Sequence, residues 1–408
     1  MPKKPAQNHL AADKRYRFPW QSGNRFELLC EGPEFFSRMI TDIQQAQHYI
    51  LLEMYLIKPG MVSQRFFHAF RDAVQRGVSV HLLLDAFGCS ALSHQQLKEL
   101  TDNGIQLALY NPIELKKHAL ALFRDHRKLM VVDGHTAYVG GAGLMDEFDS
   151  PRNPQHNWRE NMVRIEGANV AQWQTLFVDN WQNWSDQHIQ LRQSRQQDYN
   201  GKGRVSITRG PQFLEIKRSF LNHVRNAREK VWLATAYFVP SRKLRRALRR
   251  TALRGVDVRI LLPGPITDLP MVHYIAQRYY ARLLRDGVRI YEYQQRFMHA
   301  KLVLCDNWVS IGSCNIDRWN LHWNLDANQE IRCDDFTDDT IAMFENDFSN
   351  SREVTLEQWR KRSIYRRFAI WFWSFFVYLT EKVLTRIRPL RYWKLLRKTR
   401  KVIKDSDH

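Results

Sequence analysis

Cysteine is scarce in this chain, and long apolar runs are missing. The 408 residues include five cysteines and no Cys-x-x-Cys pair, namely Cys30, Cys89, Cys305, Cys314 and Cys333. An odd number without paired spacing argues against a disulfide framework or a zinc site and favours a reducing compartment. Because no run reaches about 18 apolar residues, we expect no ordinary transmembrane helix. Residues 1–20 also lack the apolar core of a signal peptide, so we expect none.

Acidic residues are few relative to basic ones. The chain has 62 Lys and Arg against 42 Asp and Glu, a formal net charge of +20. This balance implies an anionic partner, which is nucleic acid, a negatively charged membrane surface or a phosphate-bearing substrate. Charge alone does not choose among the three. The length and the 44% hydrophobic content allow two domains with sizeable cores.

The chain repeats itself once. Four pairs of segments resemble each other in order along the chain: 26–36 and 205–214, 48–57 and 230–239, 73–85 and 247–263, and 100–110 and 283–293. Apolar strands alternate in them with helices that stop at glycine, which is typical of α/β layers. The period is far too long for a solenoid, so we predict two homologous α/β domains. The boundaries that we expect are an N-terminal extension over 1–22, a first half over 23–184, a polar linker over 185–204, a second half over 205–350 and a tail over 351–408.

Each half carries the same reactive pattern. The first contains His126, Lys128 and Asp133, and the second contains His299, Lys301 and Asp306. A strand of period two places each His and the following Lys on one face. Phosphoryl transfer needs a nucleophile beside a cation that neutralises the nonbridging oxygens, and such a pair supplies both. Two copies at equivalent places make chance an inadequate explanation, so we take these six motif residues as the catalytic candidates.

The aspartates occupy a different position from the other motif residues. Asp133 and Asp306 lie seven residues after the His, an odd offset that points them away from it, so we favour a structural role at the hairpin turn. Small residues follow each return strand, at Gly140-Gly141 and Gly312-Ser313. We expect them to let the backbone approach a phosphate closely.

These motifs resemble the phospholipase D superfamily pattern HxKxxxxDxxxxxxGSxN. The resemblance implies two α/β sandwich domains related by a pseudo-twofold axis, with one active site at their interface. It also implies a two-step reaction without metal or cofactor, in which His126 attacks phosphorus and His299 is the acid and base. The chain departs from the pattern in two places. Gly143 stands where the family usually has Asn, and the second hairpin is one residue shorter. Phosphate binding is therefore expected to depend more on Ser313 and Asn315.

An acidic residue follows each motif at a similar distance. Glu160 lies 34 residues after His126, and Glu330 lies 31 residues after His299. In the superfamily an acid at this place hydrogen-bonds the catalytic imidazole and so fixes its tautomer. We expect both glutamates to orient a histidine, with an exposed strand glutamate as the alternative.

The tail from 351 onwards is basic and aromatic. It holds 16 Lys and Arg against 5 Asp and Glu, and includes the uncharged run FAIWFWSFFVYLT over 368–380. As a helix this run spans about 20 Å, short of the roughly 30 Å of a bilayer core. Beyond Pro389, apolar and basic residues alternate as in a basic amphipathic helix. We predict a membrane-binding tail, with a helix packed on the core or a nucleic-acid tail as alternatives.

The segments around both motifs look most like those of bacterial cardiolipin synthases. That resemblance implies transfer of a phosphatidyl group, from phosphatidylglycerol or another phospholipid donor, through a phosphohistidine onto the glycerol of phosphatidylglycerol. It also implies a peripheral protein on the cytoplasmic face of the bacterial membrane, bound to anionic lipid and not to nucleic acid. The alternative is a phosphodiesterase of the same superfamily, acting as a nuclease or a hydrolytic lipase.

Overall fold

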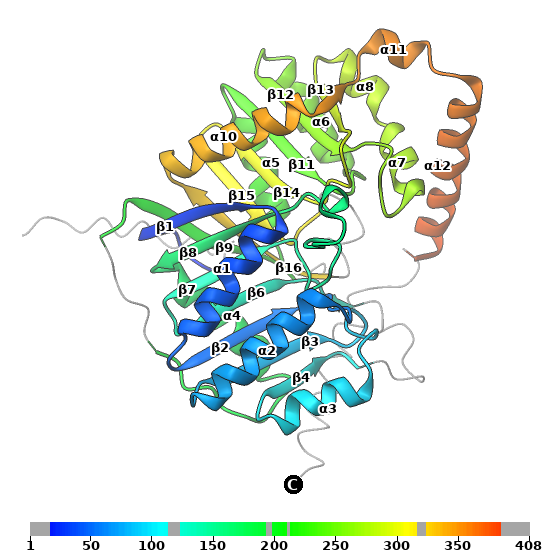
Figure 1. The fold of residues 1–408 in the computed structure, drawn as a ribbon. Helices are drawn as coiled ribbons and strands as arrows, with labels where there is room; N and C mark the ends of the chain where they lie inside the picture. Colours follow the sequence, from blue (N-terminus) through cyan, green and yellow to red (C-terminus); the bar gives the residue numbers. More distant parts are fainter. Residues whose placement is uncertain (1–16, 113–122, 193–197, 210–212, 316–323, 385–408) are drawn as a thin grey trace, which may run out of the picture.

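A computed structural model describes residues 17–112, 123–192, 198–209, 213–315 and 324–384 (Figure 1). The first half runs β1 (Gln21–Cys30), α1 (Gly32–Gln45), β2 (Tyr49–Met54), α2 (Met61–Gln75), β3 (Ser79–Asp85), α3 (His94–Asp102), β4 (Gln106–Tyr110), β5 (Arg124–Asp125), β6 (Lys128–Val132), β7 (Thr136–Gly140), the 3-10 helix η2 (Pro154–His156), β8 (Asn161–Gly167) and α4 (Asn169–Trp181).

The second half repeats this succession and continues into two further helices. It runs β9 (Gly201–Arg209), β10 (Phe213–Leu214), α5 (Glu215–Asn226), β11 (Lys230–Thr235), α6 (Arg242–Ala252), β12 (Asp257–Pro263), α7 (Pro270–Gln277), α8 (Tyr280–Arg285), β13 (Arg289–Tyr293), β14 (Lys301–Cys305), β15 (Trp308–Gly312), β16 (Asn324–Arg332), α10 (Asp334–Ser349), β17 (Ser351–Glu353), α11 (Leu356–Arg360) and α12 (Ile364–Leu384).

The strand pairings confirm two homologous halves. In the first half the neighbours run β1-β8-β7-β6-β2-β3-β4, and in the second β9-β16-β15-β14-β11-β12-β13. In both, the three strands at the far end are parallel and the others antiparallel. The parallel strands are apolar along their length because both faces are covered, and β2 (YILLEM) is buried at every position.

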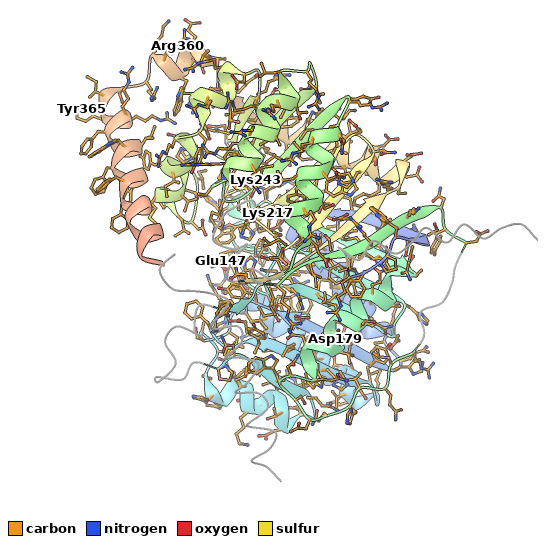
Figure 2. All side chains as sticks on the ribbon, turned by 180° about the vertical axis from the view of Figure 1, so that it is seen from behind. Glu147, Asp179, Lys217, Lys243, Arg360 and Tyr365 are labelled. Carbon is orange, nitrogen blue, oxygen red and sulfur yellow. The ribbon has the colours of Figure 1, made fainter. Side chains whose placement is uncertain are left out.

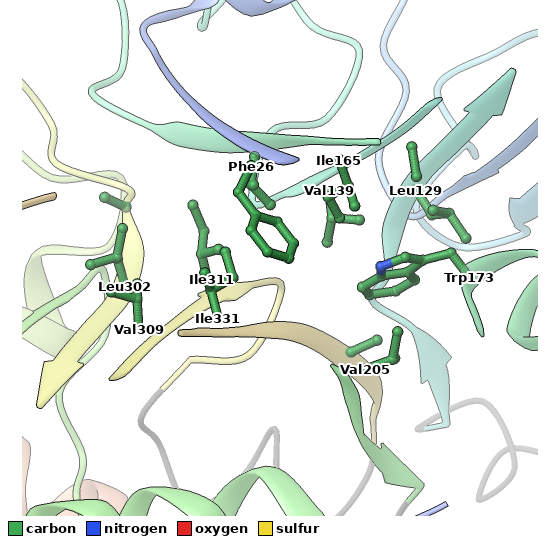
Figure 3. Close-up of a cluster of buried hydrophobic side chains, with 14 of the residues drawn as sticks. Phe26, Leu129, Val139, Ile165, Trp173, Val205, Leu302, Val309, Ile311 and Ile331 are labelled. Atoms are coloured by element: carbon green, nitrogen blue, oxygen red, sulfur yellow. The ribbon is translucent and has the colours of Figure 1, made fainter. Parts of the chain in front are cut away.

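The two halves share one hydrophobic core. Side chains from both sheets and from the helices α4 and α10 meet in a single buried cluster. Figure 3 shows Phe26, Val139 and Ile165 of the first half facing Ile311 and Ile331 of the second. Separate clusters lie outside, under α1, α2 and α3 in the first half and under α5, α6 and α8 in the second. The two sheets therefore face each other, and whatever lies at their common edge is held by both.

The linker is shorter than predicted. Strand β9 begins at Gly201, so the last four residues of the expected linker belong to the sheet. The two glycines that indicate a loop from the sequence are instead needed for close packing. A Cβ on Gly201 would collide with the backbone oxygen of Asn24, and one on Gly203 with the side chain of Asn169.

The tail forms a helix over the aromatic run, as predicted. Helix α12 lies along α7 at the edge of the second half (Figure 1). Ile370 is buried and Trp373 packs against the cluster of Val239 and Ile275. The opposite face is exposed, and Figure 2 shows Tyr365 on the outer side of the helix. The basic amphipathic helix predicted beyond Pro389 lies outside the described residues.

Candidate active site

Each motif histidine is placed by a backbone bond from the other half. The amide of His126 donates to the carbonyl of Leu325 at 2.9 Å, where β16 pairs in parallel with β5. The amide of His299 donates to the carbonyl of Arg159 at 2.7 Å. The arrangement is reciprocal, so the docking of the halves aligns both imidazoles at once.

The acids that hold the imidazoles are exchanged in the same way. Glu160 of the first half accepts from Nδ1 of His299 at 2.6 Å. Asp326 of the second half accepts from Nδ1 of His126 at 3.0 Å, and the carbonyl of Ser313 lies 3.1 Å from the same nitrogen. These carboxylates assign the proton of each neutral ring to Nδ1, which leaves Nε2 with its lone pair. In His299 the ammonium of Lys301 also lies 2.9 Å from Nδ1 and 3.3 Å from Nε2. Each ring thus presents Nε2 for attack on phosphorus or for proton transfer.

Glu330 does not take the role expected of it. Its carboxylate is buried and accepts from Nε of Arg204 at 2.9 Å and from the indole of Trp308 at 3.3 Å. The strand ladders explain the difference. Met162 pairs with Gly140 in the first half and Asn328 with Gly312 in the second, so Glu160 is equivalent to Asp326 and not to Glu330.

We expect Asp326→Asn to lower the rate of phosphodiester turnover by about 10²–10⁴-fold, because the amide no longer stabilises the imidazolium of His126. Glu330→Gln should leave kcat within a few-fold and instead lower the melting temperature, since it weakens the pairing of buried Arg204. Steady-state kinetics and thermal unfolding on the two variants check this. A larger kcat loss for Glu330→Gln than for Asp326→Asn would contradict it.

The two lysines lie beside the imidazoles and are both buried, but only Lys128 lines the pocket. Lys128 lines the pocket, donates to the carbonyl of His126 at 2.6 Å and lies 5.0 Å from the ring of Tyr55. Lys301 is fully buried and donates to Glu160 at 3.2 Å. Burial and the charge of Lys301 lower the pKa of Lys128 to about 7. Burial likewise lowers the pKa of Lys301, although Glu160 opposes it.

Without an anion between them, both imidazoles are held neutral. Burial and the neighbouring Lys301 lower the pKa of His299 to about 3, against the effect of Glu160. Burial and Lys128 lower the pKa of His126, against the effect of Asp326. A neutral imidazole is the form that attacks phosphorus. A phosphodiester bound between the lysines would add a negative charge and favour the imidazolium that an acid requires.

The motif aspartates lie at the hairpin turns and not at the site. Both have positive φ, 52° at Asp133 and 51° at Asp306. The carboxylate of Asp133 accepts from the amides of residues 47–49, and that of Asp306 from those of residues 228–230. Each aspartate therefore ties its hairpin to the start of the adjacent strand, β2 or β11, and the structure assigns it no place beside the histidines.

The glycines that follow the first motif allow close packing within the protein, where we had expected them to let the backbone approach a phosphate. A Cβ on Gly141 would collide with the carboxylate of Glu160, and one on Gly143 would lie 2.5 Å from the carbonyl oxygen of Leu56. Ser313 donates to Asp326 at 2.8 Å and so supports the acid. Asn315 lines the pocket, and its buried Oδ1 has no partner among the described residues. Of the expected phosphate ligands, the structure leaves Asn315 facing the pocket.

The pocket between the histidines has a volume of about 330 Å³ and two unlike walls. His126, Lys128 and His299 form the polar side. The apolar side comes from the segment before α7 and from α7 itself, with Val239 beside it, and consists of Val239, Leu269, Met271, Val272 and Ile275. Cluster contacts continue this wall to Trp373 of α12. The pocket therefore joins an anion-binding floor to an apolar surface.

Tyr55, Tyr237 and Asp268 are among the pocket residues that the sequence did not predict. Tyr55 and Tyr237 hold equivalent places in the repeat, and their rings lie 4.8 Å from His126 and 6.4 Å from His299. The matching tyrosines in the segments 48–57 and 230–239 were the signal that pointed to them. Asp268 lies in the loop before α7 and accepts from the hydroxyl of Tyr237. No feature of the sequence marks it, because the loop that carries it has no motif.

The described residues contain neither a cluster of metal ligands nor a helix that could span a membrane. No group of three or more His, Cys, Asp or Glu in that part of the chain is placed to hold a metal ion. No helix there is long and apolar enough to cross a membrane.

The chain is similar to proteins of one family over most of its length. A family described as "Cardiolipin synthase, PLD-like domain" matches residues 39–181 and 220–348. The cardiolipin synthase of Geobacillus thermodenitrificans is 30% identical over 352 residues, which cover 84% of this chain and 70% of that protein. The major cardiolipin synthase ClsA of Bacillus subtilis is 31% identical over 353 residues, covering 84% and 73%.

One solved structure has the same fold over nearly the whole chain. The phosphatidylserine synthase of Haemophilus influenzae Rd KW20 superposes with a TM-score of 0.69 at 13% identity, covering 90% of this chain and 97% of that one. At this identity the likeness shows the fold alone.

Proposed function

The chain belongs to the cardiolipin synthase family of PLD-like domains, within the phospholipase D superfamily, and we propose on this basis that it is a phosphatidyltransferase that forms cardiolipin. Its donor and acceptor are both phosphatidylglycerol, and it works peripherally on the cytoplasmic face of the membrane. The observation that carries the proposal is the pocket that His126 and Lys128 of the first half line together with His299 of the second, each imidazole being held by an acid of the other half.

The proposed reaction has two steps at one phosphorus. Nε2 of His126 attacks the donor phosphorus, and the bond from phosphorus to the glycerol oxygen breaks as His299 gives that oxygen a proton. His299 then takes the proton of the acceptor glycerol hydroxyl, whose oxygen attacks the phosphohistidine and releases His126. Lys128 and Asn315 neutralise and bind the nonbridging oxygens. Glu160 and Asp326 stabilise each imidazolium when it forms.

The apolar wall of the pocket favours lipid over nucleic acid. Leu269, Met271 and Val272 carry no charge to pair with a second phosphate and no exposed ring on which a base could stack. They suit an acyl chain or the glycerol backbone next to the reacting phosphate. The exposed aromatic face of α12 continues from this side of the molecule.

The function is tested by incubating the purified chain with phosphatidylglycerol vesicles in EDTA and separating the products by lipid class. We expect cardiolipin and glycerol in equal amounts, because each transfer between two phosphatidylglycerol molecules releases one glycerol. The reaction should proceed in EDTA, because the proposed steps use the two imidazoles. Formation of phosphatidic acid alone would instead indicate a hydrolytic lipase. Cleavage of DNA without lipid turnover would indicate a nuclease.

The rate should fall on the alkaline side near neutral pH. Lys128 is charged below its pKa of about 7 and neutral above it, and the charged form binds the phosphodiester. Because kcat/KM reports the free enzyme, it should decrease as the pH rises through about 7. In Lys128→Arg the guanidinium stays charged, so this decrease should move to higher pH even if the maximal rate is lower. An unchanged alkaline limb in that variant would contradict the assignment.

Asp268 is expected to select the acceptor. Its carboxylate lines the pocket beside Tyr237 and is suited to accept from glycerol hydroxyls, whereas it repels the phosphate. In Asp268→Ala, water should compete better with the acceptor, and the ratio of cardiolipin to phosphatidic acid should fall by about tenfold. Ile266→Ala, an exposed change in the same loop, is the matched control. An unchanged product ratio would exclude this role.

A further inference from the structure

A second groove lies at the C-terminal end of α7. It has a volume of about 470 Å³ and is enclosed by α7 and α8 on one side and by α11 and α12 on the other. None of its lining residues lines the active-site pocket. The lining residues are Gln277, Arg278, Ala281, Trp359, Arg362, Arg367, Ile370, Trp371 and Phe375.

The charge of this groove has one sign. Arg278, Arg362 and Arg367 line it, and no carboxylate does. Within the described part of the chain, none of the three guanidinium groups forms an ion pair. Their neighbour Arg366 differs, because it contacts Gln277 at 3.2 Å and Glu292 at 3.9 Å. The groove therefore gathers three cations that no carboxylate of the described residues neutralises.

The arginines are held in place although they lack a counterion. Arg362 donates to the carbonyl of Trp359 at 2.6 Å and lies 4.4 Å from the centre of its ring. Arg367 donates to the carbonyl of Arg360 at 2.8 Å. Burial and the charges of Arg367 and Arg366 lower the pKa of Arg362, so an anion bound here would relieve repulsion. These are properties of a prepared anion site.

The rest of the groove is apolar. Ile370 is buried at its base, and the rings of Trp371 and Phe375 stack with centroids 5.9 Å apart. Arg367 and Phe375 are eight residues apart on α12, or about 12 Å along a helix. The groove thus has a cationic end and an apolar end. A free phosphate would occupy only the cationic end, whereas the phosphate and the acyl chain of a phospholipid would occupy both.

We propose that this groove is a second, non-catalytic site for one anionic phospholipid. Arg278, Arg362 and Arg367 bind its phosphate, and an acyl chain lies over Ile370, Trp371 and Phe375. The proposal rests on the proposed function only in taking a bilayer as the surface on which the protein works. The chain beyond α12 does not match the charge of the groove. Residues 385–408 carry nine Lys and Arg against two Asp, so the three arginines would repel them.

The test uses the full chain and a phosphatidylglycerol that carries a photoreactive diazirine near the start of one acyl chain. After illumination in vesicles of phosphatidylcholine with this probe, labelled peptides are mapped by mass spectrometry. We expect adducts on α12 around Trp371 and Phe375, separate from adducts at the active site around Met271. Excess unlabelled phosphatidylglycerol should suppress both, while inorganic phosphate at the same concentration should not suppress the label on α12.

The decisive variant is Arg278→Gln/Arg367→Gln, which leaves the packing of Trp359 by Arg362 untouched. Labelling of α12 should fall about tenfold or more, while labelling at Met271 stays within twofold. Arg225→Gln/Arg228→Gln removes two exposed charges in the last turn of α5 and in the loop before β11, neither of which lines the groove, and should change neither.

The proposal would be overturned by α12 labelling that survives in the groove variant, by equal labelling with a phosphatidylcholine probe, or by competition from inorganic phosphate alone. Label at Met271 without label on α12 would overturn the second site and leave the proposed function standing. Label on α12 without label at Met271 would overturn the proposed function and leave the second site standing.

Discussion

Replacing either motif histidine by alanine is expected to abolish cardiolipin formation, with a loss of about 10⁴-fold or more for His126→Ala and for His299→Ala. One imidazole must form the bond to phosphorus and the other must move the proton, and a methyl group does neither. Both rings are largely buried, with 13% and 12% of their side chains exposed, so bulk water is poorly placed to substitute. Product formation from phosphatidylglycerol vesicles is the measurement.

A donor with an acidic leaving group separates the two roles. Phosphatidyl-p-nitrophenol needs no proton on its leaving oxygen, so His299→Ala should still release p-nitrophenol in a first turnover. His126→Ala should release none, because it has no nucleophile. The reverse pattern would exchange the two assignments. Turnover of phosphatidylglycerol at near the original rate by either variant would refute the two-histidine mechanism, provided that thermal unfolding shows the variant to be folded.

The exposed face of α12 should carry most of the affinity for membranes. Phe368, Phe372 and Phe376 follow one another at four-residue intervals and are 61%, 45% and 46% exposed. Replacing all three by serine should weaken binding to phosphatidylglycerol vesicles by about 10²-fold or more, because each buried phenyl ring contributes roughly 1.5 kcal/mol or more. Vesicle co-sedimentation measures this. Activity on a short-chain, water-soluble phosphodiester should be unchanged, since the pocket is untouched.

These substitutions are a sharper test than removing the tail. Deletion from residue 360 would also uncover the core of the second half, where Ile370 is buried. Leu253→Ser, a 67% exposed position at the end of α6, is the matched control and should leave vesicle binding intact. Because the aromatic contribution is not screened, raising the salt concentration should leave part of the vesicle binding of the parent protein intact. Equal binding by the triple variant and the parent would contradict the assignment.

The repeat made most of the fold predictable from the sequence. Two copies of the same succession of apolar strands and glycine-terminated helices predict two copies of one sheet, and the pairings have the same order in both. The exceptions lie at the boundaries, since β1 begins at Gln21, β17 of the expected tail pairs with β13, and β9 begins at Gly201. Glycine reads as a loop residue when only local conformation is considered, whereas here it is required by the contact with Asn24, which is 177 residues away.

The sequence predicted the site residues that are neighbours in one strand, but not the contacts that join residues of different halves. His126 and Lys128 are two residues apart, so strand geometry alone places them together. Choosing Asp326 over Glu330 needed the register of β16 against β15. Both acids point to one face of the same strand, and counting residues from His299 does not separate them. The apolar wall from α7 was hidden for a similar reason, because that helix reaches the pocket through the tertiary fold.

The exchange of acids between the halves has a consequence for the protein during its synthesis. When the first half has left the ribosome, His126 exists but Asp326, which lies 200 residues later, does not. His299 in turn finds Glu160 only after the second half has docked. A chain that ends before residue 326 therefore leaves His126 without its acid, and we expect it not to attack the lipids around it. The active site is therefore assembled only after the second half has been made and has docked on the first.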